Sequence, residues 1–311
     1  MEFTATQFAS SSRRLEPLRH VDAGVLNIAY YEEGPADGPV VMLIHGFPYD
    51  IHSFVDVAPQ LAAKGCRTIV PYLRGYGPTH FLDRATPRSG EQAAVGADLI
   101  ALMDALGVKR AVFAGYDWGG RAACVAAALW PDRCVGLVSV NSYLIQNIAK
   151  AMVPVKPEHE VPFWYQYYFQ LERGRAGLAA NRREIARILW KQWSPNWHFD
   201  DATFERTAVA FDNPDYVDVV IHSYRHRFGL ADGDPQYAEL QRKLAALPAI
   251  PVPAITLDGD ADGVVPATDG TASAAKFTAR RTHHVIPRAG HNLPQEEPAA
   301  FAGAVMELIK G

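Results

Sequence analysis

The chain has 311 residues, of which 49% are hydrophobic and 21% charged, and its formal net charge is −4 at pH 7. These values are those of an ordinary globular protein, and they exclude a disordered chain, a collagen and a long coiled coil. Because the 34 acidic and 30 basic residues are interspersed without long runs of one sign, nucleic acid is not expected as a partner.

Short segments rich in β-branched residues alternate with helical patterns along the chain. The segments predicted as strands are residues 25–31, 40–44, 67–71, 111–114, 135–140, 254–257 and 283–286. Such alternation predicts an α/β fold with a mostly parallel sheet and helices on both of its faces.

The strand pattern is interrupted between residues 142 and 248, where the sequence is aromatic and has helical periodicity. This indicates an inserted helical cap at 142–248, between a first core part at 1–141 and a second at 249–311. The proline-rich segment LPAIPVP marks the return of the chain to the core.

One helix of the cap is well marked. Asn213 is the expected N-cap and Pro214 is expected in the first turn. The apolar residues that follow share one face of the helix: Val217, Val220, Ile221, Tyr224 and Phe228. Tyr224 is therefore expected to face inward.

The cysteines and the apolar runs of the sequence indicate in which cellular compartment the protein is expected. Cys66, Cys124 and Cys134 lie in apolar segments without metal-binding or redox spacing, which favours core packing in a reducing compartment. The first twenty residues lack the apolar stretch of a secretory signal, and no run of about 18 apolar residues occurs in the chain. We therefore expect a soluble, cytoplasmic protein without a membrane partner.

The segment GYDWGG, residues 115–120, follows a predicted strand and precedes a helix rich in small residues. Glycines on both sides of one reactive residue are typical of the sharp strand-to-helix turn that projects a nucleophile. Asp117 would be that nucleophile. A carboxylate is already an anion at pH 7, so it can displace a leaving group at a saturated carbon without a base, forming an ester that water must later cleave.

His291, in the loop at 289–293 after the last predicted strand, would activate that water. A histidine base needs an anion that fixes its tautomer and stabilises its charged form. Asp258, Asp260 and Asp262 lie in the preceding loop. Asp262 is preferred, because the order nucleophile, acid, histidine and the spacing around it fit the pattern of α/β hydrolases.

A second turn, HGFP at residues 45–48, follows the strand predicted at 40–44. The backbone amides of Phe47 and Trp118 would converge there into an oxyanion hole, which stabilises the charge that develops on the ester carbonyl oxygen during hydrolysis. Phe47, Pro48 and Trp118 are also expected to bind the substrate, together with Trp164 of the cap.

Together these motifs resemble those of the epoxide hydrolase branch of the α/β-hydrolase superfamily, which is related to haloalkane and haloacetate dehalogenases. From about Val21 onward, HGFP, LRGYG, GYDWGG, GDADGVVP and GHNLPQE occur in the family's order. The resemblance implies a capped α/β-hydrolase fold without metal or cofactor. It also implies two cap tyrosines, Tyr165 in FWYQYYF and Tyr224 in SYR, as the acids that protonate the epoxide oxygen; a phenol has a pKa of about 10 and stays protonated at neutral pH.

The leading hypothesis is an epoxide hydrolase that converts a small-molecule epoxide and water into a vicinal diol. The alternative is a haloalkane or haloacid dehalogenase with the same Asp117, His291 and Asp262, in which the Trp118 N–H holds the halide. A non-catalytic binder is the third class, and the intact set of nucleophile, acid and histidine disfavours it. The natural substrate, the selectivity and the oligomeric state, including a homo-oligomer, are left open by the sequence.

Arg121 follows the two glycines, as a carboxylate-binding arginine does in haloacetate dehalogenases. The usual companion of that arginine is replaced here by Trp118. We therefore expect Arg121 to pack or to form an ion pair.

Overall fold

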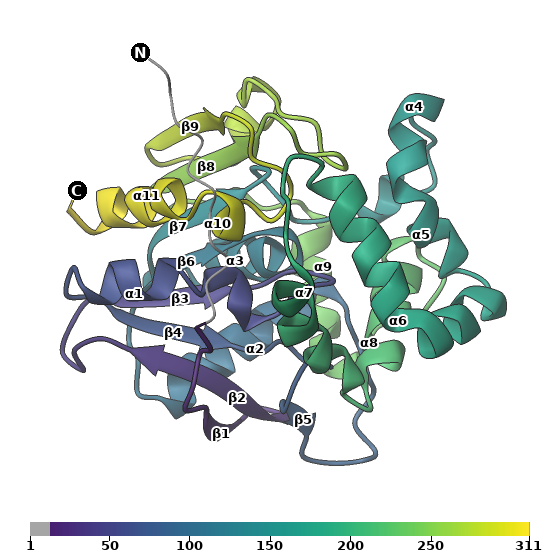
Figure 1. The fold of residues 1–311 in the computed structure, drawn as a ribbon, viewed down its shortest axis with the longest axis horizontal. Coiled ribbons are helices and arrows are strands. Elements are labelled where there is room, and N and C mark those ends of the chain that lie inside the picture. Colours follow the sequence, from purple (N-terminus) through teal and green to yellow (C-terminus); the bar gives the residue numbers. More distant parts are fainter. Residues whose placement is uncertain (1–12, 311) are drawn as a thin grey trace.

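The structure is a computed structural model that describes residues 13–310, and Figure 1 shows how its elements are layered. Residues 1–12 lie outside the described part. Two predictions fall partly on these residues: the start of the first core part, and the expectation that the first twenty residues hold no secretory signal.

One sheet of nine strands forms the centre of the described residues. The strands are β1 (Arg19–Ala23), β2 (Leu26–Glu33), β3 (Val40–Ile44), β4 (Arg67–Pro71), β5 (His80–Phe81), β6 (Ala111–Gly115), β7 (Cys134–Val140), β8 (Ala254–Gly259) and β9 (Arg281–Ile286). Their order is β1-β2-β4-β3-β6-β7-β8-β9, with β5 paired to β2. From β4 to β9 in this order all neighbours are parallel, whereas β2 is antiparallel to β1, β4 and β5.

Each strand predicted from the sequence is present, with ends that differ by two residues or fewer. The central parallel strands β3, β4, β6, β7 and β8 are mostly buried, so their sequences are largely apolar and easy to recognise. The sequence pattern missed β1 and β5. Both lie at the antiparallel end of the sheet, where RHVDA is largely exposed and HF is only two residues long.

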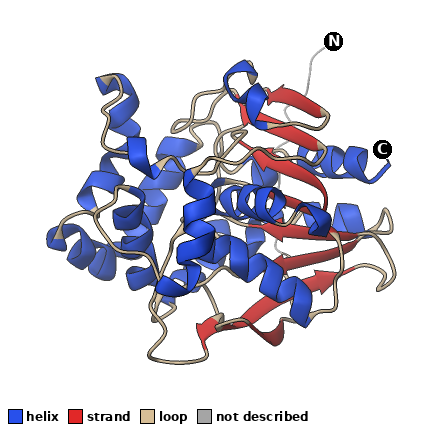
Figure 2. Cartoon of the chain, turned by 180° about the vertical axis from the view of Figure 1, so that it is seen from behind, coloured by secondary structure: helices blue, strands red, loops and turns tan. Residues whose placement is uncertain are grey.

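The core helices are α1 (Val57–Ala62), α2 (Gln92–Ala105), α3 (Asp117–Leu129), α10 (Leu293–Glu296) and α11 (Pro298–Lys310). Helices α1 and α11 pack together, as do α2 and α3. The first pair lies in front of the sheet in Figure 1, and the view from behind in Figure 2 brings the other face forward. Buried alanines let α3 lie close to β6 and β7.

Residues 142–248 contain helices and no strand, and they lie between β7 and β8. The helices are α4 (Pro157–Glu160), α5 (Trp164–Tyr168), α6 (Glu172–Trp193), α7 (Asp201–Ala208), α8 (Tyr216–Arg227) and α9 (Ala238–Ala245). In Figure 1, α4, α5, α6 and α8 lie at the right, beyond the carboxyl ends of the parallel strands, and α7 lies between them and the sheet. This is the edge at which the predicted site motifs leave the sheet.

The helix α8 begins at Tyr216, and the residue just before it, Asp215, makes no capping hydrogen bond with its side chain. Asn213 caps this turn as predicted, because its side-chain oxygen accepts a hydrogen bond from the Asp215 N–H at 2.8 Å. Its amide nitrogen also donates to the carbonyls of Gly77 and Thr79 at 2.8 and 2.7 Å. The Asn213 side chain therefore connects the helical cap at 142–248 to a core loop that lies far away in the sequence. The inward position of Tyr224 is confirmed, because the residue is fully buried.

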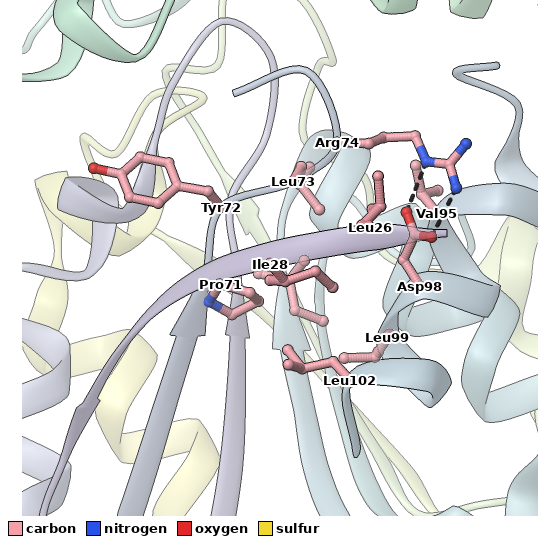
Figure 3. A pocket seen from close by; sticks show the side chains of 11 residues that line it. Leu26, Ile28, Pro71, Tyr72, Leu73, Arg74, Val95, Asp98, Leu99 and Leu102 are labelled. Carbon is pink, nitrogen blue, oxygen red and sulfur yellow. Dashed lines mark hydrogen bonds and ion pairs between the residues drawn. The ribbon is translucent and has the colours of Figure 1, made fainter. Parts of the chain in front are cut away.

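Polar contacts join the cap to the core. The Trp190 indole N–H of α6 donates to the Pro48 carbonyl at 2.8 Å. A second contact involves Arg74, which binds both carboxylate oxygens of Asp98 on α2 at 2.7 Å and also donates to the Tyr237 hydroxyl of the cap at 3.2 Å. Figure 3 shows the Arg74–Asp98 pair beside a small apolar pocket against α2, which none of the predicted site residues lines.

The three cysteines are buried thiols, as the core-packing interpretation predicts. In the described part of the chain, no helix is long and apolar enough to cross a membrane.

Candidate active site

Asp117 lies at the sharp turn between β6 and α3. Its φ of 49° is in the left-handed region, which residues other than glycine rarely adopt. A Cβ on Gly119 would lie 1.9 Å from the Ile44 carbonyl oxygen, and one on Gly115 would lie 2.6 Å from the Gly119 carbonyl carbon. Only glycine fits at these positions, so the surroundings hold the strained turn and present the Asp117 side chain at the end of the sheet.

The Asp117 carboxylate is held from two sides. Its Oδ1 accepts a hydrogen bond from the Phe47 N–H at 2.7 Å, and its Oδ2 lies 3.6 Å from Nε2 of His291. Burial raises the pKa of this carboxyl, but the hydrogen bonding and charge of His291 outweigh it, and the pKa falls below its usual value. Asp117 is therefore an anion at neutral pH.

His291 lies between two carboxylates. Its Nδ1 is 2.8 Å from Oδ2 of Asp262, and Oδ1 of Asp262 accepts the N–H groups of Val264 and Val265 at 2.9 Å. Burial lowers the pKa of His291, but Asp262 and Asp117 together raise it to about 10. The ring is therefore an imidazolium at neutral pH, with one N–H donating to Asp262 and the other directed toward Asp117.

The two other acids of the loop before His291 have different partners. Asp258 accepts hydrogen bonds from the N–H and the hydroxyl of Thr268 at 2.9 and 3.0 Å. Asp260 accepts from the Arg288 N–H. Of the three candidates in the sequence, the structure therefore brings Asp262 to the histidine ring.

The cap brings Tyr165 of α5 and Tyr224 of α8 to the same place. Their ring centroids are 5.3 Å apart, and they lie 5.9 and 5.3 Å from the ring of Phe47. The Tyr224 hydroxyl is buried without a hydrogen-bond partner among the described residues. Burial raises the pKa of Tyr165 to about 12 and that of Tyr224 well above its ordinary value. Both phenols therefore keep their protons at neutral pH.

The residues predicted to form the oxyanion hole and to bind the substrate do not all contact Asp117. The Phe47 amide already contacts the carboxylate. The Trp118 amide lies in the first turn of α3, where N–H groups have no partner within the helix, and its ring stacks on Phe47 at 5.6 Å. Pro48 follows a cis bond. Trp164 has ring contacts with Tyr165 and Tyr168 and donates to Gln192 at 3.1 Å, so it supports Tyr165 from within the cap.

Glu296 is a site residue that the sequence analysis missed. Its carboxylate accepts the N–H groups of Gly290 and Asn292 at 2.7 and 3.0 Å, on either side of His291. The Ser194 hydroxyl, just after α6, donates to the same carboxylate at 2.6 Å and accepts from the His291 N–H at 3.1 Å. Burial raises the pKa of Glu296 to about 7. The sequence held one indication of this role: Glu296 is an acidic residue five positions after His291, within the motif GHNLPQE.

Within residues 13–310, no group of His, Cys, Asp and Glu side chains is arranged to hold a metal ion. The groups that the described side chains bring together are a largely buried carboxylate, an imidazole flanked by two acids, and two buried phenols.

Comparisons with known proteins bear on the fold and the family of the chain. Residues 39–298 match the family described by the α/β-hydrolase fold. Among curated proteins, epoxide hydrolase A of Mycobacterium tuberculosis is 27% identical over 94% of this chain and 97% of its own length. Epoxide hydrolase 3 of Siraitia grosvenorii is 32% identical over 42% of this chain and 41% of its own.

Solved structures show the same similarity. The crystal structure of a candidate epoxide hydrolase from Klebsiella pneumoniae is 49% identical, with a TM-score of 0.93, over 94% of this chain and 97% of that one. Epoxide hydrolase A from Mycobacterium thermoresistibile is 23% identical, with a TM-score of 0.70, over 95% and 98% of the two chains. The second likeness is one of fold alone.

Proposed function

The chain belongs to the α/β-hydrolase fold family, and on this premise we propose that it is an epoxide hydrolase that opens an epoxide to a vicinal diol through an ester on Asp117. The similarity to proteins named epoxide hydrolases supports this proposal. The observation that carries it is the juxtaposition of a buried carboxylate at the strained turn with two buried tyrosines of the cap. Phe47 joins the three groups, because its N–H donates to Asp117 at 2.7 Å and its ring packs against the rings of Tyr165 and Tyr224.

In the first half of the reaction, Asp117 attacks a ring carbon of the epoxide and the bond between that carbon and the ring oxygen breaks. The oxygen leaves as an alkoxide, which is a strong base. Tyr165 or Tyr224 donates a proton to it, because a phenol held in its protonated form is a sufficient acid for an alkoxide. The product of this step is a hydroxyalkyl ester of Asp117.

In the second half, the charge on Asp117 is gone, so His291 loses one of the two carboxylates that raise its pKa. The imidazolium can then return a proton to the tyrosinate and become neutral. The neutral ring, held by Asp262, takes a proton from water, which attacks the ester carbonyl. Collapse of the tetrahedral intermediate releases the diol and restores the carboxylate, the imidazolium and the phenol.

The oxyanion of that intermediate needs donors that are already in place. The Phe47 N–H, which lies 2.7 Å from a carboxylate oxygen of Asp117, is positioned for this role. We assign the second donor to the Trp118 N–H.

A single turnover in water enriched in ¹⁸O tests the covalent route, with enzyme in excess over epoxide. Water attacks the ester carbonyl, so we expect an unlabelled diol and one ¹⁸O atom in the peptide that contains Asp117. Mass spectrometry of the diol and of the digested enzyme measures both. Heavy oxygen in the first-turnover diol would show that water attacks the epoxide directly.

A dehalogenase is the second candidate, because the Trp118 indole N–H is buried without a partner among the described residues and is a donor that a halide could accept. A halide leaves without a proton, whereas an alkoxide needs one. The double variant Tyr165→Phe/Tyr224→Phe separates the two candidates. We expect it to lose epoxide turnover by at least about 100-fold, the usual contribution of a general acid. A halide-releasing activity that survives this change would favour the dehalogenase.

A further inference from the structure

The side-chain amide of Gln166 connects the proposed acid Tyr165 to an arginine of the cap. Gln166 follows Tyr165 in α5 and is 5% exposed. Its Nε2 donates to the Tyr165 hydroxyl oxygen at 3.0 Å, and its Oε1 accepts from the Arg227 guanidinium at 3.3 Å. Arg227 is the last residue of α8, the helix that also carries Tyr224. The amide therefore lies between the positive charge of Arg227 and the oxygen of Tyr165.

Arg227 is held in place by neutral partners. Its guanidinium carbon lies 4.7 Å from the centroid of the Tyr224 ring. With the amide oxygen of Gln146 turned toward Arg227, that oxygen accepts from Nε at 2.6 Å and from Nη2 at 3.3 Å. None of these partners in the described part of the chain is a carboxylate, so they leave the positive charge of Arg227 unneutralised. This charge is available to stabilise negative charge that forms on a neighbouring phenol.

The guanidinium decides which end of the Gln166 amide faces Tyr165. An arginine has five N–H donors and no acceptor, so the amide oxygen must turn toward Arg227 and the amide NH2 group toward Tyr165. The Tyr165 oxygen then accepts a hydrogen bond from Gln166, and its own proton remains available for another acceptor. A reversed amide would accept the Tyr165 O–H through its oxygen and hold that proton away from the substrate.

We propose that Arg227 and Gln166 are positioning residues that make Tyr165 the phenol which transfers its proton to the epoxide oxygen. This inference rests on the proposed function and specifies its general acid. When the bond between the ring carbon and the ring oxygen breaks, the alkoxide oxygen takes the Tyr165 proton and Tyr165 becomes a phenolate. The Gln166 N–H and the Arg227 charge stabilise this phenolate until His291 returns a proton to it.

Tyr224 lacks this support. Its hydroxyl is buried without a hydrogen-bond partner among the described residues, so a phenolate there would have no donor. Burial raises the pKa of Tyr165 to about 12, with the charge of Arg227 as the main opposing influence, whereas burial raises the pKa of Tyr224 well above its ordinary value. Tyr165 is therefore the stronger acid of the two. Tyr224 keeps its proton and donates a hydrogen bond to the same oxygen.

The test compares two epoxides of similar size, methyloxirane and trifluoromethyloxirane, in single turnovers followed by rapid quench. The fluorines withdraw electrons, so the second epoxide gives a weaker base that needs less help from an acid. In Arg227→Met we expect ester formation from methyloxirane to slow by about 10- to 100-fold, the value of an interaction with a charged group, and from trifluoromethyloxirane by less than about threefold. Ester hydrolysis should be unchanged.

Two substitutions of Gln166 separate positioning from packing. Gln166→Glu keeps nearly the same shape, but a carboxylate only accepts hydrogen bonds, so it would hold the Tyr165 proton. Gln166→Met only removes the donor. We expect ester formation from methyloxirane to be at least about tenfold slower in Gln166→Glu than in Gln166→Met. A side chain that only packs would give the opposite order, because glutamate fits the site better than methionine.

Arg225→Met is the matched control, because Arg225 lies on the same helix and donates to Glu172 at 3.0 Å and to the Phe169 carbonyl at 3.2 Å. The ratio of the two ester-formation rates should keep its wild-type value in this variant. Arg227→Lys, which keeps the charge, should restore part of the ratio that Arg227→Met loses. Circular dichroism checks that each variant is folded. Because the ratio is measured within one variant, partial loss of folded enzyme cancels.

A titration of the phenol is independent of turnover. Difluorotyrosine replaces Tyr165 in the full chain, because its phenol loses the proton nearer neutral pH, and ¹⁹F NMR follows its ionisation. We expect the pKa of this phenol to rise by about one pH unit in Arg227→Met and in Gln166→Glu. It should keep its wild-type value in Arg225→Met.

The outcomes distinguish this inference from the proposed function. If the wild-type enzyme opens neither epoxide but the titration depends on Arg227 and Gln166, the positioning stands and the proposed function fails. If both epoxides are opened and the ratio of rates in Arg227→Met equals that of the wild type, the positioning is overturned and the epoxide hydrolase is not. Faster ester formation in Gln166→Glu than in Gln166→Met would overturn it in the same way.

Discussion

At the scale of single residues, the site is organised by the charges that surround His291. Asp262 lies at 2.8 Å on one side of the ring and Asp117 at 3.6 Å on the other. In the free enzyme the imidazole of His291 is therefore protonated at neutral pH. In the proposed mechanism, ester formation removes the charge of Asp117, so the attack on the epoxide would itself prepare His291 to act as the base in ester hydrolysis.

Replacing His291 should separate the two halves of the reaction. In His291→Gln, Asp117 can still attack the epoxide, but the water has no base, so hydrolysis should slow by about 100- to 10,000-fold. We expect an ester to accumulate, seen as an increase in intact protein mass equal to the mass of the epoxide. Asp117→Ala should show no increase. Steady diol release from His291→Gln without an adduct would contradict the assignment of His291 as the base for ester hydrolysis.

The same residue should give the protein a recognisable pH dependence of stability. The pKa of His291 is about 10 in the folded state and 6.5 for an ordinary histidine. A raised pKa means that the contribution of the imidazolium is complete below about pH 6.5 and is lost as the pH rises toward 10. Urea unfolding at pH 6, 8 and 10 should therefore show that the advantage of the wild type over His291→Gln shrinks with rising pH. An advantage that stays constant over this range would show that folding does not shift the pKa of His291.

At the scale of elements, the turn between β6 and α3 depends on close contact between backbones. In Gly119→Ala the new Cβ would lie 1.9 Å from the Ile44 carbonyl oxygen. Because this oxygen belongs to the backbone of β3, it can move away only by distorting the strand. We expect a loss of about 1–3 kcal/mol in the free energy of unfolding. Gly303→Ala in α11 is the control, because its Cβ would meet nothing within 4 Å, and it should gain about 0.5–1 kcal/mol. Equal stabilities in urea would contradict the steric account of the turn.

A second element, the loop that carries His291, is held by Glu296. We expect Glu296→Gln to lower kcat by about 10- to 100-fold with a smaller effect on KM, because the amide cannot accept from both Gly290 and Asn292 and the lost hydrogen bonds are worth about 1–3 kcal/mol. Rapid-quench kinetics should place the loss in ester hydrolysis. Glu297→Gln is the matched control, since its side chain takes no part in these contacts. Equal kcat values for the two variants would exclude the positioning role.

At the scale of the whole molecule, the buried Arg74–Asp98 pair (Figure 3) links the loop after β4 to α2, and Arg74 also donates to Tyr237 of the cap. Asp98→Ala would leave Arg74 buried without a counter-ion, so we expect a loss of about 3–5 kcal/mol in the free energy of unfolding. Asp104→Ala removes an exposed partner of Arg133 and should change stability by less than about 1 kcal/mol. Because the pair joins the cap to the core, the two should unfold together in the wild type. Fluorescence and circular dichroism should then report a single unfolding transition with the same midpoint. Separate transitions would show that the cap unfolds on its own.

Much of this architecture could be predicted from local sequence patterns. The buried parallel strands, the turn around Asp117 and the helical stretch between β7 and β8 each depend on neighbouring residues, because periodicity and glycine placement act over a few positions. The edge strands β1 and β5 could not be recognised, since their residues are polar or few and only pairing with β2 orders them.

The sequence by itself determined the fold class and the positions of Asp117, Asp262 and His291 after predicted strands, because a parallel sheet brings the carboxyl ends of its strands to one edge whatever the loops contain. Only the tertiary structure decided that Asn213 binds core carbonyls and that the Glu296 carboxylate accepts the backbone N–H groups on either side of His291. Hydrogen bonds and charge balance depend on groups that are distant along the chain and meet only after folding, so no local pattern encodes them.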